Sequence, residues 1–564
     1  MRHNPNNGKI EDVPTPKCDV LVAGGSLASL AAAIAAANAS ATLAVCYTDI
    51  TDWPGGQLTA SGVPAVDFGN ANAAPSPNLV ASFSDLMATF SGNPGNCWVS
   101  VKCFRPDVAL GGWIMPMLAS LPNLAVYLNT AVVGATTGAD GSVTSVSAVQ
   151  RTPVGGTSPW DVPTSAQLAD WYSAAPSPMF TKTVLNFTGM AVVVDATEFG
   201  DVLVTAGAAV TQGVETPTEY ATTTLDSCGQ GTVMPFYMQY GATPAPTPDP
   251  TPGGGGEGAP FSMGNFTWNA VWTYRRVTAA AGSSATTPAP GDISNQNWGG
   301  GNDYDTGYLL TPIPSSPPAP GGWAGGINTS QLAAAEARAY GWYHAFKNAS
   351  AAAVMPFLSL NTTVAGTGTG LAKMPYLRDT RRSGAGIYGF RLFYTALSNC
   401  TYPGPVPPAP SPDASRHRVR APATTGPCTT AYDFEDTVAI GDYFYADTHE
   451  EVPAACAYPP YLVAGAPVLP YYIPFRALTN AAAPNLLVAG KTMAQSFFAN
   501  SGTRLHPEEW ATGTAAGVAA ALMAPRGWNT SVMYANVGLL QDALTAIGAP
   551  LTWHLPPLAL RPRR

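Results

Sequence analysis

Apolar residues near the N-terminus follow a pattern that predicts a compact unit of strands and a helix. No charged residue occurs between Asp19 and Asp49, and this stretch is rich in alanine. Residues 20–23 predict a buried strand, residues 27 to about 37 a helix, and residues 42–47 a second strand. A membrane-spanning helix needs about 20 residues that are mostly Leu, Ile, Val or Phe, whereas glycine, serine and asparagine interrupt this run. The pattern therefore predicts strand, tight turn, helix and strand, and no membrane span.

The turn between the first strand and the helix is typical of a dinucleotide-binding turn, although the match is imperfect. Such a unit places a pyrophosphate at the helix N-terminus, where unpaired amides and the helix dipole favour an anion. The pattern has glycine at three places: Gly24 fills the first, and Ser26 and Ser29 fill the others. The carboxylate nearest to the expected ribose-binding position is Asp49, two residues later than usual. These residues alone leave two interpretations open, a dinucleotide site and a plain buried α/β unit.

Three further stretches extend the α/β pattern. Trp53–Gly69 carries a second glycine–glycine turn, and alternating apolar and polar residues on both sides of residues 139–141 predict a β-hairpin. Met190–Gly207 begins with a buried strand. Residues 485–523 predict a strand, a glycine turn, a polar loop and a helix that opens near Gly513.

Proline and glycine mark the middle of the chain as irregular. Residues 242–260, 312–322 and 401–422 cannot bury enough apolar surface to fold, so we expect surface loops or extended spacers there. Residues 330–350 have helical spacing and begin with a serine suited to an N-cap, which predicts a helix. We interpret these segments as insertions into one substrate domain.

Composition narrows the classes of function. A formal net charge of −9, with only 11% charged residues, leaves no dense basic stripe and argues against a nucleic-acid partner. The eight cysteines show no CxxC or Cys/His spacing, so we expect no metal site. Cys97/Cys103 and Cys400/Cys428 each bracket a loop-like stretch and are the first pairs to consider, although spacing alone does not determine pairing.

Cysteines and glycosylation acceptors together favour an oxidising, secretory compartment. The asparagines in Asn-X-Ser/Thr sequences are Asn38, Asn186, Asn265, Asn328, Asn348, Asn361, Asn399 and Asn529. Residues 1–17, in contrast, contain no apolar signal core. We expect a protein that is secreted or lies in the secretory lumen, with an intracellular protein as the alternative.

Several short motifs follow one another in a fixed order. They are GGQLTASG at Gly55–Gly62, VDATEFGD at Val194–Asp201, YLRDTRR at Tyr376–Arg382, DTH at Asp447–His449, IPFRAL at Ile473–Leu478, and the run Asn485–Gly517. Together with the N-terminal strand–glycine–helix unit, this ordered set resembles the family of FAD-dependent oxidoreductases built on the two-dinucleotide-fold scaffold related to glutathione reductase. The chain departs from the family at Ser26, Ser29 and Asp49, and at Lys491, where the family usually has arginine. These departures concern cofactor affinity more than fold.

The resemblance implies an α/β fold with FAD as the cofactor. A Rossmann-like FAD-binding domain, with a parallel sheet and a β-meander, would comprise residues 14–230 and 470–545, and an inserted α+β substrate or cap domain would comprise residues 231–469. The residues implied to bind FAD are Gly24, Gly25 and Ser26 at the pyrophosphate, Asp49 at the adenosine ribose, Gly55, Gly56, Gln57 and Leu58 beside the ribityl chain, Val132 or Val133 at adenine, Gly490, and Gly513, Thr514, Ala515 and Ala516 at the flavin's pyrimidine carbonyl. For the last group, close helix packing is the alternative.

Two histidines are candidates for proton transfer, because histidine is the usual proton carrier near neutral pH. His506 precedes the C-terminal helix and is expected to act as a base or an orienting group, with Arg504 as a clamp for an anion or the substrate. His449, with Asp447 as a possible hydrogen-bond partner, suits a structural or a catalytic role.

The predicted function is that of an FAD-dependent oxidase or dehydrogenase that takes a hydride from a small organic donor. Two alternatives remain open: a secreted or wall-associated glycoprotein that keeps the scaffold without catalysis, and an enzyme that binds NAD alone. Arg381 and Arg382 suit either anion binding or internal ion pairs. The pattern does not predict the donor, the electron acceptor or the oligomeric state.

Overall fold

The structure is a computed structural model, and it describes residues 15–69, 76–90, 92–155, 158–253, 260–284, 286–319, 321–401, 428–449, 451–452 and 456–555. His3, His417 and most of the stretch 401–422 lie outside the described residues. The central element is a five-stranded parallel sheet with the order β24-β7-β1-β2-β3. Its strands are β1 (Val20–Ala23), β2 (Val45–Thr48), β3 (Leu124–Tyr127), β7 (Val192–Asp195) and β24 (Leu486–Val488).

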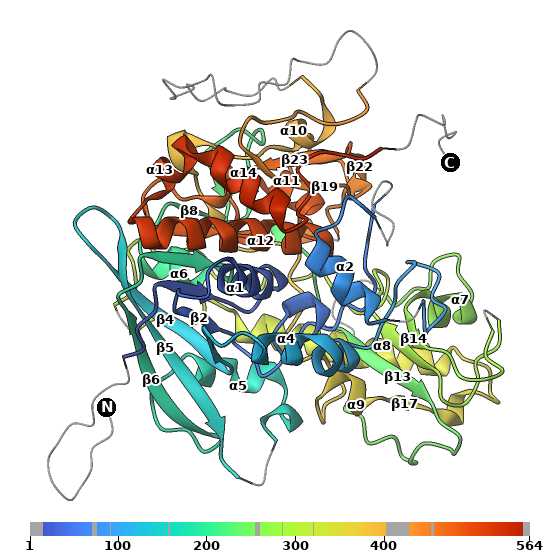
Figure 1. Cartoon of the computed structure of the whole chain (residues 1–564). Helices are drawn as coiled ribbons and strands as arrows, with labels where there is room; N and C mark the ends of the chain where they lie inside the picture. Colours follow the sequence, from blue (N-terminus) through green and yellow to red (C-terminus); the bar gives the residue numbers. More distant parts are fainter. Residues whose placement is uncertain are drawn as a thin grey trace, which may run out of the picture.

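Helices α1 (Leu27–Ala39) and α12 (His506–Met523) lie side by side over this sheet (Figure 1). A Cβ atom added to Gly513 would lie 2.1 Å from the Ala28 carbonyl oxygen, and one added to Gly517 would lie 2.2 Å from the Ala32 carbonyl oxygen. Because later positions of α12 meet later positions of α1, the two helices run in the same direction. All residues of α1 from Leu27 to Ala37 are buried, which explains why this helix carries no charge.

Side chains alternate between the two faces of the parallel sheet, as they must in a strand. Val20 and Val22 pack in the same apolar cluster as α1 and α12. Leu21 and Ala23 pack instead against an antiparallel sheet with the order β4-β5-β6. This sheet consists of β4 (Thr130–Thr137), β5 (Val143–Pro153) and β6 (Phe180–Thr188), and it confirms the predicted hairpin and meander.

An antiparallel sheet with helices beside it forms the inserted part of the fold, at the lower right of Figure 1. Its order is β14-β15-β13-β17, and its strands are β13 (Phe236–Tyr240), β14 (Arg276–Thr278), β15 (Ile293–Gln296) and β17 (Leu358–Leu360). Helices α7 (Trp268–Tyr274) and α8 (Thr329–Asn348) belong to the same region, and the buried aromatic residues Trp272, Trp342 and Phe346 lie in one cluster with Phe236. The α/β class with antiparallel insert sheets therefore agrees with the prediction, while the domain boundaries stay a prediction.

Shorter elements complete the described part of the chain. The helices are α2 (Ala81–Ala88), α3 (Pro106–Ala109), α4 (Met115–Ala119), α5 (Thr164–Trp171), α6 (Asp201–Thr205), α9 (Thr362–Ala365), α10 (Tyr394–Ser398), α11 (Phe497–Thr503), α13 (Thr530–Ala535) and α14 (Val537–Ala546). The antiparallel strand pairs are β8 (Val210–Thr211) with β18 (Arg382–Ser383), β9 (Val214–Glu215) with β10 (Thr224–Leu225), β11 (Gly229–Gln230) with β21 (Glu451–Val452), β12 (Thr232–Val233) with β16 (Asp303–Tyr304), β19 (Thr437–Gly441) with β23 (Tyr471–Pro474), and β20 (Tyr445–Ala446) with β22 (Ala466–Pro467).

Two predicted helix starts are wrong. Helix α12 begins at His506 and not near Gly513, because Pro507 occupies its first turn, where a missing amide hydrogen costs nothing. Helix α8 is capped by Asn328 and not by Ser330: the Asn328 side chain accepts a hydrogen bond from the Gln331 amide at 3.2 Å.

All eight cysteines form disulfides. Cys97–Cys103 and Cys400–Cys428 are the two pairs that the sequence suggested first. Cys18–Cys46 joins the residues before β1 to β2, and Cys228–Cys456 joins positions 228 residues apart.

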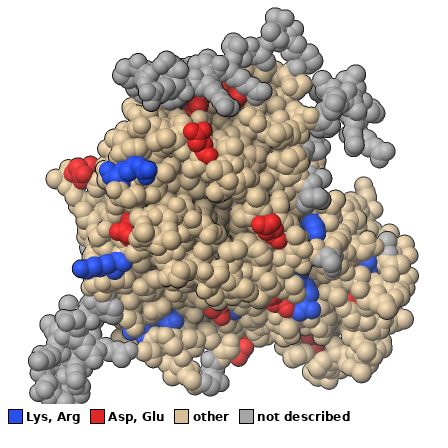
Figure 2. All heavy atoms as spheres, viewed as in Figure 1, with Lys and Arg blue, Asp and Glu red and all other residues tan. Residues whose placement is uncertain are grey.

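Charged side chains are sparse and scattered over the face of the molecule seen in Figure 2. None of the helices within the described ranges is long and apolar enough to cross a membrane.

Candidate cofactor and substrate site

The turn between β1 and α1 lies at the carboxyl edge of the parallel sheet, where open α/β sheets bind their ligands. Gly24 is required there because a Cβ atom would lie 2.4 Å from the Thr48 carbonyl oxygen and 2.5 Å from the Tyr47 ring. Gly25 has a φ of +148°, which a side chain would strain. The first glycine is thus set by the close approach of β2, and the second by its backbone conformation.

Ser26 and Ser29 replace the expected glycines and tie the turn together. The Ser26 hydroxyl donates to the Ala196 carbonyl oxygen at 2.6 Å and accepts from the Ser29 amide at 3.3 Å. The Ser29 hydroxyl donates to the Ser26 carbonyl oxygen at 2.6 Å and accepts from the Gly25 amide at 3.2 Å. Both hydroxyl groups are therefore used within the protein.

Two later glycines bring distant segments onto the start of α1. Gly56, in the 3-10 turn η1 (Gly56–Leu58), has a φ of +52°, and a Cβ atom there would lie 2.7 Å from the Leu27 amide nitrogen. Gly490, with a φ of +64°, lies where a Cβ atom would be 2.9 Å from that of Ala28. We call this arrangement, Gly24–Leu27 with Gly56 and Gly490, the cradle.

Three charged side chains fill the space beside the cradle. The Glu509 carboxylate accepts a hydrogen bond from the Leu27 amide at 3.2 Å. The Lys491 ammonium lies 2.8 Å from a carboxylate oxygen of Glu198 and 3.4 Å from one of Glu509. All three side chains are at most 2% exposed, and burial raises the pKa of Glu198 to about 7 although Lys491 acts in the opposite direction. We call Glu198, Lys491 and Glu509 the carboxylate–lysine cluster.

The residues expected at the ribose and adenine are engaged inside the protein. Asp49 accepts hydrogen bonds from the Tyr47 hydroxyl at 2.7 Å and the Thr51 amide at 3.0 Å. Burial raises the pKa of Asp49 to about 7, despite these bonds. The Val133 carbonyl oxygen accepts a hydrogen bond from the Gly321 amide at 3.2 Å.

The group Gly513–Ala516 does not lie at a helix N-terminus. Because α12 begins at His506, these residues lie further along the helix, and Gly513 packs against the Ala28 carbonyl group of α1. The amides expected to face a flavin carbonyl are hydrogen-bonded within α12, and the free N-terminal amides belong to the turn around Glu508.

A cavity of about 790 Å³ adjoins the cradle. Gln57, next to Gly56, lines the cavity, and its side-chain amide donates to the Arg504 carbonyl oxygen at 3.2 Å. The predicted catalytic residues Arg504, His506 and His449 also line it, so the structure brings all three together. The aromatic lining residues are Phe266, Tyr274, Trp298, Tyr376, Tyr443 and Tyr445.

A chain of alternating charges runs along one wall of the cavity. Arg378 donates to both carboxylate oxygens of Asp303, at 3.0 and 2.8 Å. His449 Nδ1 lies 3.7 Å from Asp303, and its Nε2 lies 2.7 Å from an Asp447 carboxylate oxygen. Burial would raise the pKa of Asp447, but the hydrogen bond and charge of His449 hold it well below its usual range. The wall therefore places a carboxylate near each ring nitrogen of His449.

Arg504 ends this chain of charges without a carboxylate of its own. Its guanidinium donates to the Tyr376 hydroxyl at 2.8 Å and to the Asp447 carbonyl oxygen at 3.1 Å, and its Nε has no hydrogen-bond partner among the described residues. The side chain is 3% exposed. A buried cation with spare donors favours an anionic ligand.

His506 lies at the base of the cavity in a neutral form. Burial lowers its pKa to about 3, and its Nε2 lies 3.1 Å from the Val63 carbonyl oxygen. Since a carbonyl oxygen only accepts, Nε2 carries the proton and Nδ1, which has no partner in the described part of the chain, is left as an acceptor.

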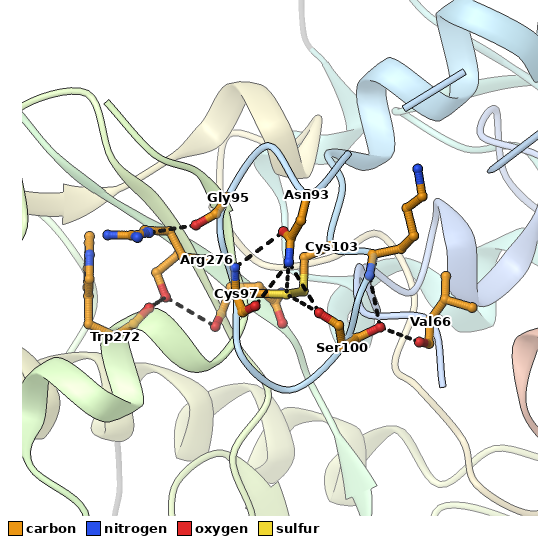
Figure 3. Close-up of a disulfide and its surroundings, with 11 residues drawn as sticks. Val66, Asn93, Gly95, Cys97, Ser100, Cys103, Trp272 and Arg276 are labelled. Atoms are coloured by element: carbon orange, nitrogen blue, oxygen red, sulfur yellow. Dashed lines mark hydrogen bonds between the residues drawn. A yellow bond between two sulfur atoms is a disulfide. The ribbon is translucent and has the colours of Figure 1, made fainter. Parts of the chain in front are cut away.

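The Cys97–Cys103 disulfide closes a loop (Figure 3). This loop forms another part of the cavity wall. Val99, between Cys97 and Cys103, lines the cavity, and its amide donates to the Tyr274 carbonyl oxygen at 3.3 Å. Asn93 donates to the carbonyl oxygens of Cys97 and Ser100, at 2.9 and 3.2 Å. The loop is thus held against the end of α7.

Sequence reasoning missed the carboxylate–lysine cluster and Asp303. In the sequence, Lys491 stood out only as a departure from the family, and Glu198 and Glu509 were not candidates. Charged residues make up only 11% of the chain, and each buried one needs a partner. Charged residues within apolar stretches were therefore the signal that could have indicated these pairs. Arg381 and Arg382 are engaged internally: Arg381 donates to four carbonyl oxygens, and Arg382 pairs with Glu215 at 3.1 Å.

The part of the chain that the structure describes contains no group of three or more His, Cys, Asp or Glu residues that could hold a metal ion.

Comparisons with known proteins agree with the resemblance seen in the sequence. Residues 19–157 and 416–544 match the family model described as FAD dependent oxidoreductase. No curated protein matches the chain.

Solved structures give only distant similarities. Among them are p-nitrophenol 4-monooxygenase PnpA from Pseudomonas putida DLL-E4, with 13% identity over 40% of this chain and 48% of that chain and a TM-score of 0.23, and a mutant of the E. coli quinol fumarate reductase FrdA, with 11% identity over 41% of each chain and a TM-score of 0.21. The chain thus spans less than half the length of these two proteins, and at these scores the similarity carries no argument about reaction or substrate. The family match therefore identifies residues 19–157 and 416–544 as an FAD-dependent oxidoreductase region, and the cofactor that it implies is FAD.

Proposed function

We propose that the chain is an oxidase or dehydrogenase that takes a hydride from a small organic donor bound in the cavity. The observation that carries this proposal is the contact between the cradle and the cavity: Gly56 lies on the start of α1, while Gln57, the next residue, lines the cavity and holds the Arg504 carbonyl group. FAD, when bound, supplies the atom that accepts the hydride. A cofactor held at the cradle would therefore face a donor held beside Arg504.

The backbone of the cradle fits a dinucleotide, but the Glu509 side chain occupies part of the space that the diphosphate needs. Gly24 and Gly56 allow the close approach of β2 and η1 to the start of α1, as a diphosphate site requires. The Leu27 amide, however, is taken by the Glu509 carboxylate. A diphosphate fits this position only when the Glu509 side chain moves away.

When FAD is bound, we expect Gly24 and Gly25 to allow its diphosphate to approach the Ser26 backbone closely, because their own amides already donate to the Thr48 and Ser29 hydroxyl groups. Gly55, Gly56, Gln57 and Leu58 would lie along the ribityl chain. Asp49, Val133, Gly490 and Gly513–Ala516 remain proposals, and of these only Gly490 lies directly on the cradle.

We propose a donor that carries a negative group. Arg504 has a buried Nε without a hydrogen-bond partner among the described residues, and Arg275 adds a second guanidinium to a lining that also contains Asp67 and Asp447. The aromatic residues of the cavity suit the flat or apolar remainder of such a molecule.

The two histidines suit different tasks. His506 is too weakly basic to take a proton near neutral pH, so its Nδ1 would accept a hydrogen bond from the donor and orient it. His449 lies between two carboxylates with 37% of its side chain exposed, so its ring is oriented by the protein while solvent reaches it.

Four disulfides support secretion or a secretory lumen as the place of action. Glycosylation is proposed only at accessible acceptors: Asn38, Asn265, Asn348, Asn399 and Asn529 are exposed, whereas Asn361 is 7% exposed and caps α9.

A second candidate, a scaffold without catalysis, is favoured by one observation. The amide that would contact a diphosphate already has an internal partner in Glu509. In this case the protein would show no spectrum of bound flavin, either as purified or after FAD is added.

The deciding experiment is an absorbance spectrum of the purified, disulfide-bonded protein, followed by reduction with candidate donors without oxygen. The proposal expects a bound flavin that bleaches with an anionic donor. Protein that neither retains nor takes up flavin, or flavin that no donor reduces, contradicts it.

Arg504 provides the matching prediction. Arg504→Gln removes the guanidinium, so KM for an anionic donor should rise about ten- to hundredfold while kcat changes less. Arg504→Lys keeps the charge and should show a smaller rise. Equal rises for an anionic donor and its neutral analogue would show that Arg504 does not bind the negative group.

A further inference from the structure

The first turn of α12 reaches beyond the start of α1. Gly513 packs at Ala28, close to the first turn of α1, so the residues of α12 before Gly513 extend past the N-terminus of α1. Glu509 lies four residues, about one turn or 6 Å, before Gly513. Its side chain therefore stands over the N-terminal amides of α1 and reaches Leu27 across 482 positions of sequence.

The Glu509 carboxylate resembles a phosphate group, which is the ligand proposed to bind at the N-terminus of α1. It is an anion with two oxygens at a helix N-terminus, where the dipole favours negative charge. One oxygen accepts the Leu27 amide, and the other, which has no hydrogen-bond partner in the described ranges, lies 3.4 Å from the Lys491 ammonium. Glu509 is 0% exposed.

The surrounding charges oppose a second anion. Glu198 and Glu509 share one lysine, so a diphosphate added here would meet two carboxyl groups and one ammonium in a buried site. Like charges repel strongly at low dielectric. If Glu509 withdraws, Lys491 loses one carboxylate partner and can take a phosphate in its place.

We propose that Glu509 is a built-in competitor for FAD, occupying the diphosphate position until the cofactor displaces it. This inference rests on the family's cofactor and not on the identity of the donor. It predicts that FAD binding to the wild-type chain is weakened by the cost of moving Glu509 from Leu27 and Lys491.

The test is to titrate flavin-free protein with FAD, ADP and riboflavin and to measure binding by fluorescence and calorimetry. ADP contains the diphosphate, whereas riboflavin contains the ring without it. In Glu509→Ala and Glu509→Gln, Kd for FAD and ADP should fall at least tenfold relative to wild type, while Kd for riboflavin stays the same. Without ligand, Glu509→Ala should unfold at a lower temperature, because the Leu27 amide and Lys491 lose a buried partner.

Glu508→Gln is the matched control. Glu508 lies on the same turn but accepts a hydrogen bond from the Asp442 amide at 3.0 Å rather than from α1. Its replacement should leave Kd for FAD and ADP unchanged. If Glu509→Ala does not fold, Glu509→Gln, which keeps the shape of the side chain, gives the same comparison.

Three outcomes overturn the inference. Equal FAD affinity in wild type and both Glu509 variants shows that Glu509 does not compete, and leaves the oxidoreductase proposal standing. If the Glu509 variants gain as much affinity for riboflavin as for ADP, the effect of Glu509 does not concern the diphosphate. No binding of FAD or ADP by any variant overturns the inference and supports the scaffold without catalysis.

Discussion

Adjacent glutamates on one helical turn have different environments in this protein. Glu509 faces α1 and Lys491, whereas Glu508 faces the Asp442 amide, and one Glu508 oxygen has no hydrogen-bond partner among the described residues. Burial raises the pKa of Glu508 to about 8, despite the hydrogen bond from Asp442. At the residue scale, the same side chain thus acts as a partnered carboxylate at one position and as a protonated acid at the next.

This difference predicts a pH dependence of stability. The folded protein holds the Glu508 proton up to about pH 8, whereas the unfolded chain releases it near the ordinary value of about 4.5. The stability that Glu508 contributes is fully present below pH 4.5 and is lost as the pH rises towards 8, by up to about 1.4 kcal/mol per pH unit. Glu508→Gln removes this loss, so its unfolding temperature should rise relative to wild type between pH 5 and pH 8. If the unfolding temperatures of Glu508→Gln and wild type differ by the same amount from pH 5 to pH 8, Glu508 does not titrate as proposed.

At the scale of elements, the packing of α1 on α12 sets the geometry of the cradle. The small residues of α1 and the glycines of α12 let the two backbones approach closely, as the distances from Gly513 and Gly517 to α1 show. This contact places the start of α1 at the carboxyl edge of the parallel sheet, with the first turns of α12 extending beyond it. The cradle is therefore a product of the helix pair as much as of the glycine turn.

Gly513→Ala tests this contact. The new methyl group would lie 2.1 Å from the Ala28 carbonyl oxygen, so the helices must separate and the protein should lose about 1–3 kcal/mol of stability or more. Gly538→Ala in α14 is the control: a Cβ atom there meets nothing within 4 Å, and the better helix former should be neutral or stabilise by up to about 1 kcal/mol. Similar unfolding free energies for the two variants, measured in urea, would contradict the close packing.

At the scale of the whole molecule, distant segments are joined by long-range links. The parallel sheet takes β24 from the C-terminal part of the chain and β1 from the N-terminal part. Cys228–Cys456 encloses most of the inserted part, whereas Cys97–Cys103 closes a short loop at the cavity wall.

The two disulfides should differ in their contribution to stability. Loop-closure entropy predicts about 5 kcal/mol for a link across 228 residues and about 2 kcal/mol for one across 6 residues. The double replacement Cys228→Ser/Cys456→Ser should therefore lower the unfolding temperature more than Cys97→Ser/Cys103→Ser, measured by calorimetry. The reverse order would show that strain or residual structure outweighs loop length.

Local pattern by itself determined the elements whose signals lie within a short stretch of chain. The apolar run Val20–Ala23, the Gly24–Gly25 turn and the alanine-rich helix after it predicted β1, the turn and α1, because strand period, glycine turns and helix composition act between near neighbours. The hairpin around Asp140 and the ordered motifs of the family were visible in the same way. These local patterns and motifs were sufficient to predict the fold class and FAD as the cofactor.

Only the tertiary structure decided which charged groups meet. Glu509 reaches Leu27, Lys491 reaches Glu198, and Asp303 of the inserted part holds Arg378 and His449. These partners are far apart in sequence, and no local period links them. Their pairing follows from the parallel packing of α1 and α12 and from the position of the insert. For that physical reason the sequence indicated a diphosphate site at the start of α1, while the fold alone placed a carboxylate inside it.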